Sequence, residues 1–258
     1  MAIIIFGLPP RGTLDTFSDE KASHLVERLA QNGTWQVPTL VEEQSFALLV
    51  SGRLMDQRGM NFVPSPMLKS WNLPNILTPL NAEDRQDLVK IVPMMLDMVG
   101  RMHRAGVRIL PGSDAPWMVV PGFSLHDELV LLIKGGFTPA DSLRAATSDS
   151  AEFLGLQSSL GTVETGKVAD LVLLEANPLE DIRNTQKISG VFLQGRFLSR
   201  QALDGLLQQV KTLGAPRSGP SKRASISQAG RLPNGRLQGS YPAIAFEKYS
   251  RQTVSALD

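Results

Sequence analysis

The spacing of apolar and polar residues along the chain predicts alternating helices and strands. Apolar side chains share one face of residues 18–32, which predicts an amphipathic helix that Ser18 caps and Gly33 ends. Two shorter segments, Thr34–Val41 and Val107–Leu110, are predicted as buried strands. Helices that lie between buried strands favour a parallel sheet with helical crossovers.

A long connection and one long helix separate the two predicted strands. Ser51–Leu80 is rich in Pro, Met and Asn, which indicates an excursion over one face of the fold. Asn81 then caps a helix with an acidic first turn that runs towards Ala105. Pro93 lies inside this helix and is expected to kink it or split it in two, because proline lacks a backbone N–H group.

Beyond the second strand the pattern predicts two more helices and then shorter strands. Leu125–Lys134 is predicted as a helix that Gly135 and Gly136 break, and Thr138 begins the next helix with Pro139 in its opening turn. The remaining predictions are a strand at Ala169–Leu174, a hairpin of Ser189–Gly195 and Arg196–Leu198, and a short helix at Gln201–Val210.

Composition narrows the class of protein. With 258 residues, 42% of them hydrophobic, the chain can bury a core, and a net charge of +1 gives no field for nucleic acid or a membrane. Without cysteine, disulfides and thiolate zinc sites are excluded, and any metal would need His, Asp or Glu. The apolar start Ala2–Phe6 lacks a basic region and is too short for a secretory signal or a membrane span, so a cytoplasmic protein is expected.

The stretch GVRILPGSDAP carries the main candidate residue, Asp114. This aspartate closely follows the predicted strand Val107–Leu110, and α/β proteins often place functional side chains at that end of a strand. Asp114 could serve as a catalytic carboxylate, or it could cap the turn or the following helix. The residues alone leave both roles open.

Three phrases in order resemble the C-terminal portion of the amidohydrolase superfamily, closest to its imidazolonepropionase and prolidase-like branch. They are GVRILPGSDAP, PGFSLHDELVLLIKGGFTPADSLRAAT and LGTVETGKVADLVLLEANPLEDI. The resemblance implies an α/β fold with an incomplete TIM barrel in residues 1–157. Short strands of a composite β-sandwich and a terminal helix would follow in residues 158–213. A disordered basic tail, which could touch an acidic partner or simply be solvated, is predicted in residues 214–258.

Members of this superfamily are metal-dependent hydrolases that cleave carbon–nitrogen bonds in amides, cyclic amides and some dipeptides. On this comparison Val37–Val41 resembles barrel strand 7 and Val107–Leu110 resembles barrel strand 8. Asp114 then corresponds to the strand-8 aspartate, which contacts a divalent metal such as zinc and takes a proton from metal-bound water. The resemblance therefore implies that Asp114 is both a catalytic residue and a metal ligand.

The other metal ligands of the family have no counterpart in this sequence. The family uses an HxH pair on strand 1, a Lys or an acid on strand 4, and single histidines on strands 5 and 6. This sequence has no HxH pair, and His24, His103 and His126 lie in predicted helices without ligand spacing. A zinc site normally needs at least three protein ligands, so this chain alone is not expected to bind the metal.

Most of the other candidate residues are expected to have structural roles. His126 is expected to be packed or at the surface, and His24 and His103 at the surface. Asp127 and Glu128 indicate a solvated acidic first turn rather than a catalytic pair. The remaining expectations are Lys134 at a helix end, Lys167 and Asp170 in a turn and its strand, Trp117 at a pocket mouth, and Gly112 and Pro116 in a loop that admits substrate.

Three functions remain open from the sequence. The chain is an inactive amidohydrolase piece from a truncated or split gene, or a hydrolase of small amides that a separate polypeptide with the HxH half completes. The third is a non-catalytic interaction module. A sheet of few parallel strands leaves its edges and an apolar face open, so an oligomer or a partner chain is expected to cover them.

Overall fold

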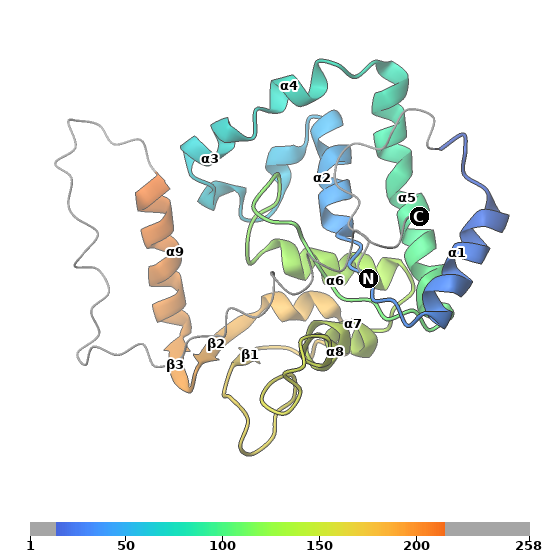
Figure 1. The fold of residues 1–258 in the computed structure, drawn as a ribbon. Coiled ribbons are helices and arrows are strands. Elements are labelled where there is room, and N and C mark those ends of the chain that lie inside the picture. The colour runs from blue at the N-terminus through green and yellow to red at the C-terminus, as the bar shows by residue number, and fades with distance from the viewer. Residues whose placement is uncertain (1–13, 215–258) are drawn as a thin grey trace, which may run out of the picture. The chain divides into compact units, whose positions relative to one another are not determined.

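The computed structural model describes residues 14–214, and helices dominate this part of the chain (Figure 1). The predicted tail beyond Gly214 and the apolar start Ala2–Phe6 lie outside the described residues. The α-helices are α1 (Asp19–Gln31), α2 (Leu40–Val50), α3 (Ser65–Ser70), α4 (Leu73–Leu77), α5 (Ala82–Arg104), α6 (Ser124–Lys134), α7 (Pro139–Ala146), α8 (Ser148–Phe153) and α9 (Arg200–Gly214). The 3-10 turns are η1 (Leu54–Asp56), η2 (Met60–Phe62) and η3 (Ile182–Gln186), and the strands are β1 (Leu171–Leu174), β2 (Ile188–Leu193) and β3 (Arg196–Ser199).

Side-chain caps begin the helices where the sequence predicts them. Ser18 accepts a hydrogen bond from the backbone N–H of Lys21 at the start of α1. Asn81 and Asp84 form a reciprocal capping box at the start of α5, with bonds of 2.8 and 3.0 Å. α5 continues through Pro93, so the predicted split is wrong. The helix packs against both α1 and α2.

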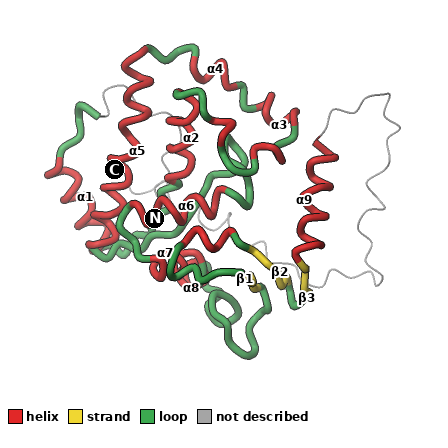
Figure 2. The backbone as a smooth tube through the Cα atoms, turned by 180° about the vertical axis from the view of Figure 1, so that it is seen from behind, coloured by secondary structure: helices red, strands yellow, loops and turns green. Residues whose placement is uncertain are grey.

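The two predicted barrel strands are paired, but only over one residue each. Gln36 and Ile109 form an isolated parallel bridge, in which the Gln36 N–H donates to Arg108 O and the Leu110 N–H donates to Gln36 O. The prediction of a strand through Val41 is wrong, because α2 begins at Leu40. An isolated strand pair is marginal, and Pro38 lacks the N–H that would extend this one. In Figure 2 the strand colour is accordingly confined to β1–β3.

Two apolar clusters hold the described part of the chain together. The larger one joins α1, α2, α5, α6 and the segment that carries Ile109. The smaller one is built by Ser51–Leu80, which packs over the loop beyond Asp114, and the indole N–H of Trp71 donates to Pro116 O at 3.1 Å. The predicted excursion is therefore a packed cover, and it fixes the loop that follows the candidate residue. No helix among the described residues is long and apolar enough to cross a membrane.

The C-terminal elements confirm the predicted strand and hairpin. β1, β2 and β3 form an antiparallel sheet in that order. α9 is longer than the predicted helix. The helix predicted to begin at Thr138 is followed by a separate short helix, α8, because Thr147 interrupts the helical backbone between α7 and α8. A division into parts at residue 157 stays a prediction.

Candidate functional site

Asp114 lies in the loop that leaves the Ile109 segment, and its backbone is in the left-handed region with φ 49°. Aspartate is one of the few non-glycine residues that adopt this conformation readily. The side chain is half-buried. α6 begins ten residues later with Phe123 at its N-cap position, so Asp114 does not cap that helix.

Gly112 lies directly against the segment that precedes α2. A Cβ atom at Gly112 would meet Val37 Cγ1 at 2.4 Å and Thr39 Cγ2 at 3.0 Å. Glycine is therefore required for the close approach of the two segments, and a role of Gly112 in admitting substrate stays a prediction. The approach brings the start of α2 beside the Asp114 loop.

Glu42, in the first turn of α2, is the partner of Asp114. Its side chain is buried, and its pKa is raised to about 7, first by burial and then by the negative charge of Asp114, with a smaller effect of Glu43. A hydrogen bond between the carboxyl groups of Glu42 and Asp114 also favours the protonated form of Glu42. Glu42 can thus hold a proton near neutral pH while its carboxyl group is in contact with that of Asp114.

Glu43 and Glu128 add two further buried carboxyl groups. Burial raises the pKa of Glu43, and its Oε2 has no hydrogen-bond partner among the described residues. Glu128 is completely buried, and its Oε2 accepts a hydrogen bond of 2.8 Å from the backbone N–H of Val41. Burial raises the pKa of Glu128 to about 8, although backbone N–H groups of Val41, Leu40 and Gly112 favour its charged form.

The prediction that Asp127 and Glu128 form a solvated first turn is wrong for Glu128. Its neighbours Leu131 and Leu132, three and four positions later, are buried on the same side of α6. That spacing is a signal in the sequence that identifies Glu128 as an inward-facing residue. Asp127 does face outward and is paired with Arg58 at 3.3 Å.

The histidines do not approach Asp114 as a ligand set. His24 is exposed on α1, and His126 is half-buried with its Nδ1 atom 3.0 Å from Thr185 Oγ1. His103 is half-buried rather than at the surface, because its ring stacks on Phe137 with the centroids 3.9 Å apart. The rings of His126 and His103 therefore make structural contacts with neighbouring side chains.

The described residues do not fit a metal site on their own. Nowhere between residues 14 and 214 do three or more His, Asp or Glu side chains gather in a way that could hold a metal ion. Asp114 and Glu42 offer two carboxyl groups, which is fewer than the three protein ligands of an ordinary zinc site. The residues therefore support acid–base chemistry more directly than metal binding.

Two structural expectations near the sheet are confirmed. Lys167 contacts Glu164 and Thr162 within a turn, and Asp170 accepts a hydrogen bond of 2.6 Å from the Gln194 N–H. Lys134 ends α6 as expected. None of these groups belongs to the Asp114 site.

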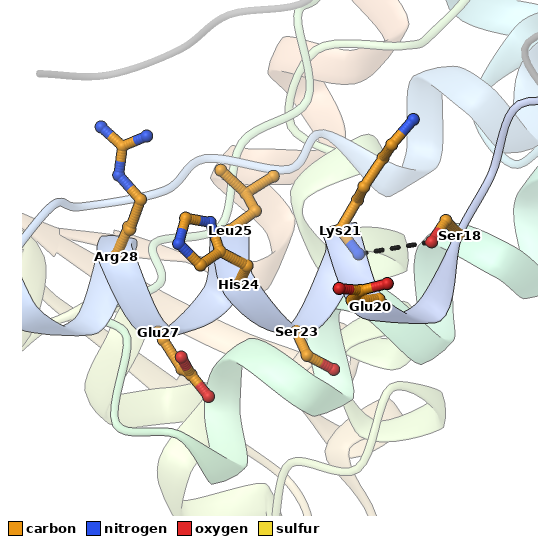
Figure 3. Close-up of a pocket in the computed structure, with 8 residues that line it drawn as sticks. All are labelled: Ser18, Glu20, Lys21, Ser23, His24, Leu25, Glu27 and Arg28. Carbon is orange, nitrogen blue, oxygen red and sulfur yellow. Dashed lines mark hydrogen bonds between the residues drawn. The ribbon is translucent and has the colours of Figure 1, made fainter.

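A surface depression lies along α1 (Figure 3). Its lining comes entirely from α1 and its cap, Ser18, and includes acidic, basic and apolar side chains without a common polar focus. Since none of the residues that line it is Asp114, Glu42 or Glu128, the depression is not part of the candidate site.

The described helices, the single parallel bridge and the small antiparallel sheet define a protein of the α/β class. A family model described as Amidohydrolase family matches residues 30–198, which is more than half of the chain, and the chain therefore belongs to the amidohydrolase family. This membership confirms the resemblance that the three sequence phrases indicate.

Individual relatives support the same family. Ochratoxinase of Aspergillus niger is 38% identical over 153 residues, which cover 58% of this chain and 31% of ochratoxinase. Imidazolonepropionase of Symbiobacterium thermophilum is 32% identical over 75 residues, which cover 29% of this chain and 18% of the relative. The chain thus spans less than a third of the length of these curated relatives.

One solved structure relates the fold to a complete enzyme. Bottromycin amidohydrolase aligns with a TM-score of 0.56 and 22% identity, over 70% of this chain and 40% of that one. At this identity the likeness concerns the fold alone.

Proposed function

We propose that this chain supplies one carboxyl-bearing part of a hydrolase that cleaves carbon–nitrogen bonds in small amides. The observation that carries the proposal is the contact between Asp114 and Glu42 at the ends of two adjacent parallel segments. In α/β barrels, this end of the strands carries the catalytic side chains. Membership in the amidohydrolase family favours amide hydrolysis over other acid–base reactions.

The chemistry of the chain's own residues is proton transfer. Glu42 is buried and its pKa is raised to about 7, so it can hold a proton beside Asp114 and release it near neutral pH. In amide hydrolysis the departing nitrogen must receive a proton. The half-buried Asp114 is the member of the pair that can reach a substrate, and Glu42 is its buried proton partner.

A metal-dependent reaction would need residues from outside this sequence. The family resemblance implies a divalent metal such as zinc, and the described residues offer too few ligands for it. We therefore place the remaining ligands on a further stretch of polypeptide, whether continuous with this one or separate. In this assignment Asp114 is one ligand of the completed site.

A chimeric enzyme tests this function. In the chimera, the segment of Aspergillus niger ochratoxinase that aligns with this chain is replaced by the residues of this chain. We expect hydrolysis of ochratoxin, and we expect Asp114→Asn to lower kcat/KM by at least about 100-fold, because a positioned acid–base group contributes that much. Asp149→Asn, in the first turn of α8, is the matched control and should retain activity. A folded chimera whose activity survives Asp114→Asn would contradict the proposal.

The exposed face of the C-terminal sheet supports a covering partner. Leu171 and Phe192 are paired across β1 and β2, and Phe192 is paired with Phe197 across β2 and β3, so these side chains share one face with Leu173. Leu173 and Phe197 are exposed, at 42% and 50%. We propose that this apolar face is covered by a second copy of the chain.

Replacement of Leu173 by lysine tests this association. The variant places a charge in the middle of the apolar face, so we expect a protein that is oligomeric in solution to shift towards the monomer mass in light scattering after size-exclusion chromatography. Val163, which is 82% exposed outside the strands, gives the control variant Val163→Lys. A monomeric wild-type protein at the same concentration would contradict self-association through this face.

A further inference from the structure

The start of α2 lacks the usual means of satisfying its first backbone donors. Thr39, at the N-cap position, has φ 46°, and its side chain makes no capping hydrogen bond. The N–H of Glu42 bonds to Thr39 O at 3.0 Å, and the N–H of Val41 points instead to Glu128. A helix N-terminus carries unpaired N–H groups and a partial positive charge, so a carboxyl group from elsewhere can substitute for the cap.

Glu128 reaches this point from α6, 87 positions further along the chain. It is completely buried, and none of the ion pairs among the described residues includes it. A buried carboxyl group without a cation is costly and persists only where hydrogen bonds compensate for lost hydration. An apolar side chain of the same size would fill the volume, so packing alone does not explain a glutamate at this position.

The same carboxyl group also faces the other backbone segment. Its Oε2 accepts the hydrogen bond from Val41, and its Oε1 is buried without a hydrogen-bond partner among the described residues. The backbone N–H of Gly112 lies close enough to favour the charged form of the carboxyl group, and Gly112 is the residue whose missing Cβ lets the two segments touch. Glu42 follows Val41 by one residue, and Asp114 follows Gly112 by two. The buried side chain of Glu128 thus lies next to the two backbone positions, Val41 and Gly112, that closely precede the Glu42 and Asp114 pair.

We propose that Glu128 is a positioning residue, whose carboxyl group caps α2 and ties it to the Gly112 loop, so that Glu42 and Asp114 are held in contact. This inference rests on the proposed function only where it assigns the Glu42 and Asp114 pair a role in catalysis. The tie itself is a property of the folded chain and can be tested without substrate or metal.

Glu128→Met and Glu128→Gln separate positioning from packing. Methionine keeps the volume and removes the acceptor, whereas glutamine keeps an oxygen that can accept from the Val41 N–H. In Glu128→Met we expect hydrogen exchange at the Val41 amide to accelerate about tenfold or more, the loss expected from a broken buried hydrogen bond. The nuclear Overhauser contact between the Glu42 and Asp114 side chains should weaken in the same variant. Glu128→Gln should restore most of both signals.

Asp127→Asn, on the same helix, is the matched control and should leave both signals unchanged. Unaltered Val41 exchange and an unaltered contact between the Glu42 and Asp114 side chains in folded Glu128→Met would overturn the inference. If Glu128→Met does not fold, a measurement on the wild-type protein still tests the tie. A through-hydrogen-bond NMR coupling between the Val41 nitrogen and the Glu128 carboxyl carbon is expected, and its absence would overturn the tie. Failure of the ochratoxin chimera, by contrast, would bear on the proposed function and leave these results standing.

Discussion

Gly112→Ala is expected to lower the free energy of unfolding by about 3 kcal/mol, the upper part of the range for overpacking a close contact. The added methyl group would lie 2.4 Å from Val37 Cγ1, well inside van der Waals contact. Valine is branched at Cβ and rotates little, so the backbone segments must separate to relieve the clash. Urea unfolding followed by circular dichroism measures the loss.

Two variants make the Gly112 experiment specific. Gly205→Ala, in α9 where nothing lies within 4 Å of the added atom, should be neutral or stabilising, because alanine favours a helix more than glycine does. Val37→Ala combined with Gly112→Ala should recover part of the lost stability, since it removes the atom that clashes. A loss below about 0.5 kcal/mol for Gly112→Ala would contradict the close approach, because such small changes are typical of unconstrained surface sites.

The second large effect is a loss of stability as the pH rises. The pKa of Glu42 is about 7 in the folded protein and 4.5 in its ordinary state, so the folded chain binds more protons than the unfolded chain between these values. Stability from this group is complete below pH 4.5 and is lost as the pH rises through 7, by about 3 kcal/mol in total. Glu128, with a pKa of about 8, acts in the same direction and extends the loss to higher pH.

Glu42→Gln should remove the Glu42 part of this pH dependence. The variant is expected to gain stability relative to the wild-type protein at pH 8 and to gain little or nothing at pH 5, because only the charged form is repelled by Asp114. Burial lowers the pKa of His126, which works in the opposite direction below its ordinary value of 6.5, so the comparison is clearest above that pH. Glu83→Gln, at an exposed position of α5, is the control. Equal pH dependence in the wild-type protein and Glu42→Gln would refute the assignment.

The outcome for Asp114 and its neighbours shows which features the sequence could predict. The position of Asp114 after an apolar segment follows from local pattern, and so do the capped starts of α1 and α5. The partner Glu42 was missed because Thr34–Val41 was interpreted as a strand, whereas the helix begins at Leu40. Strand length here depends on neighbouring strands, which are not encoded in the segment itself.

Glu128 illustrates the opposite difficulty. A charged residue in the first turns of a helix is commonly solvated, and this general preference concealed the apolar spacing of Glu128 with Leu131 and Leu132. The role of Gly112 could not be predicted either, because the atoms that require glycine there lie on a segment more than seventy residues earlier in the chain. Contacts between distant segments therefore account for the part of the site that local patterns leave out.

The central claim is that Glu42 holds a proton beside the carboxyl group of Asp114, and a carbon-13 NMR titration of the Glu42 side-chain carboxyl carbon tests it most directly. The account predicts that Glu42 titrates near pH 7 and that its pKa falls towards the ordinary value in Asp114→Asn, because the negative charge of Asp114 is one cause of the raised pKa. Titration of Glu42 near 4.5, independent of Asp114, would contradict the account.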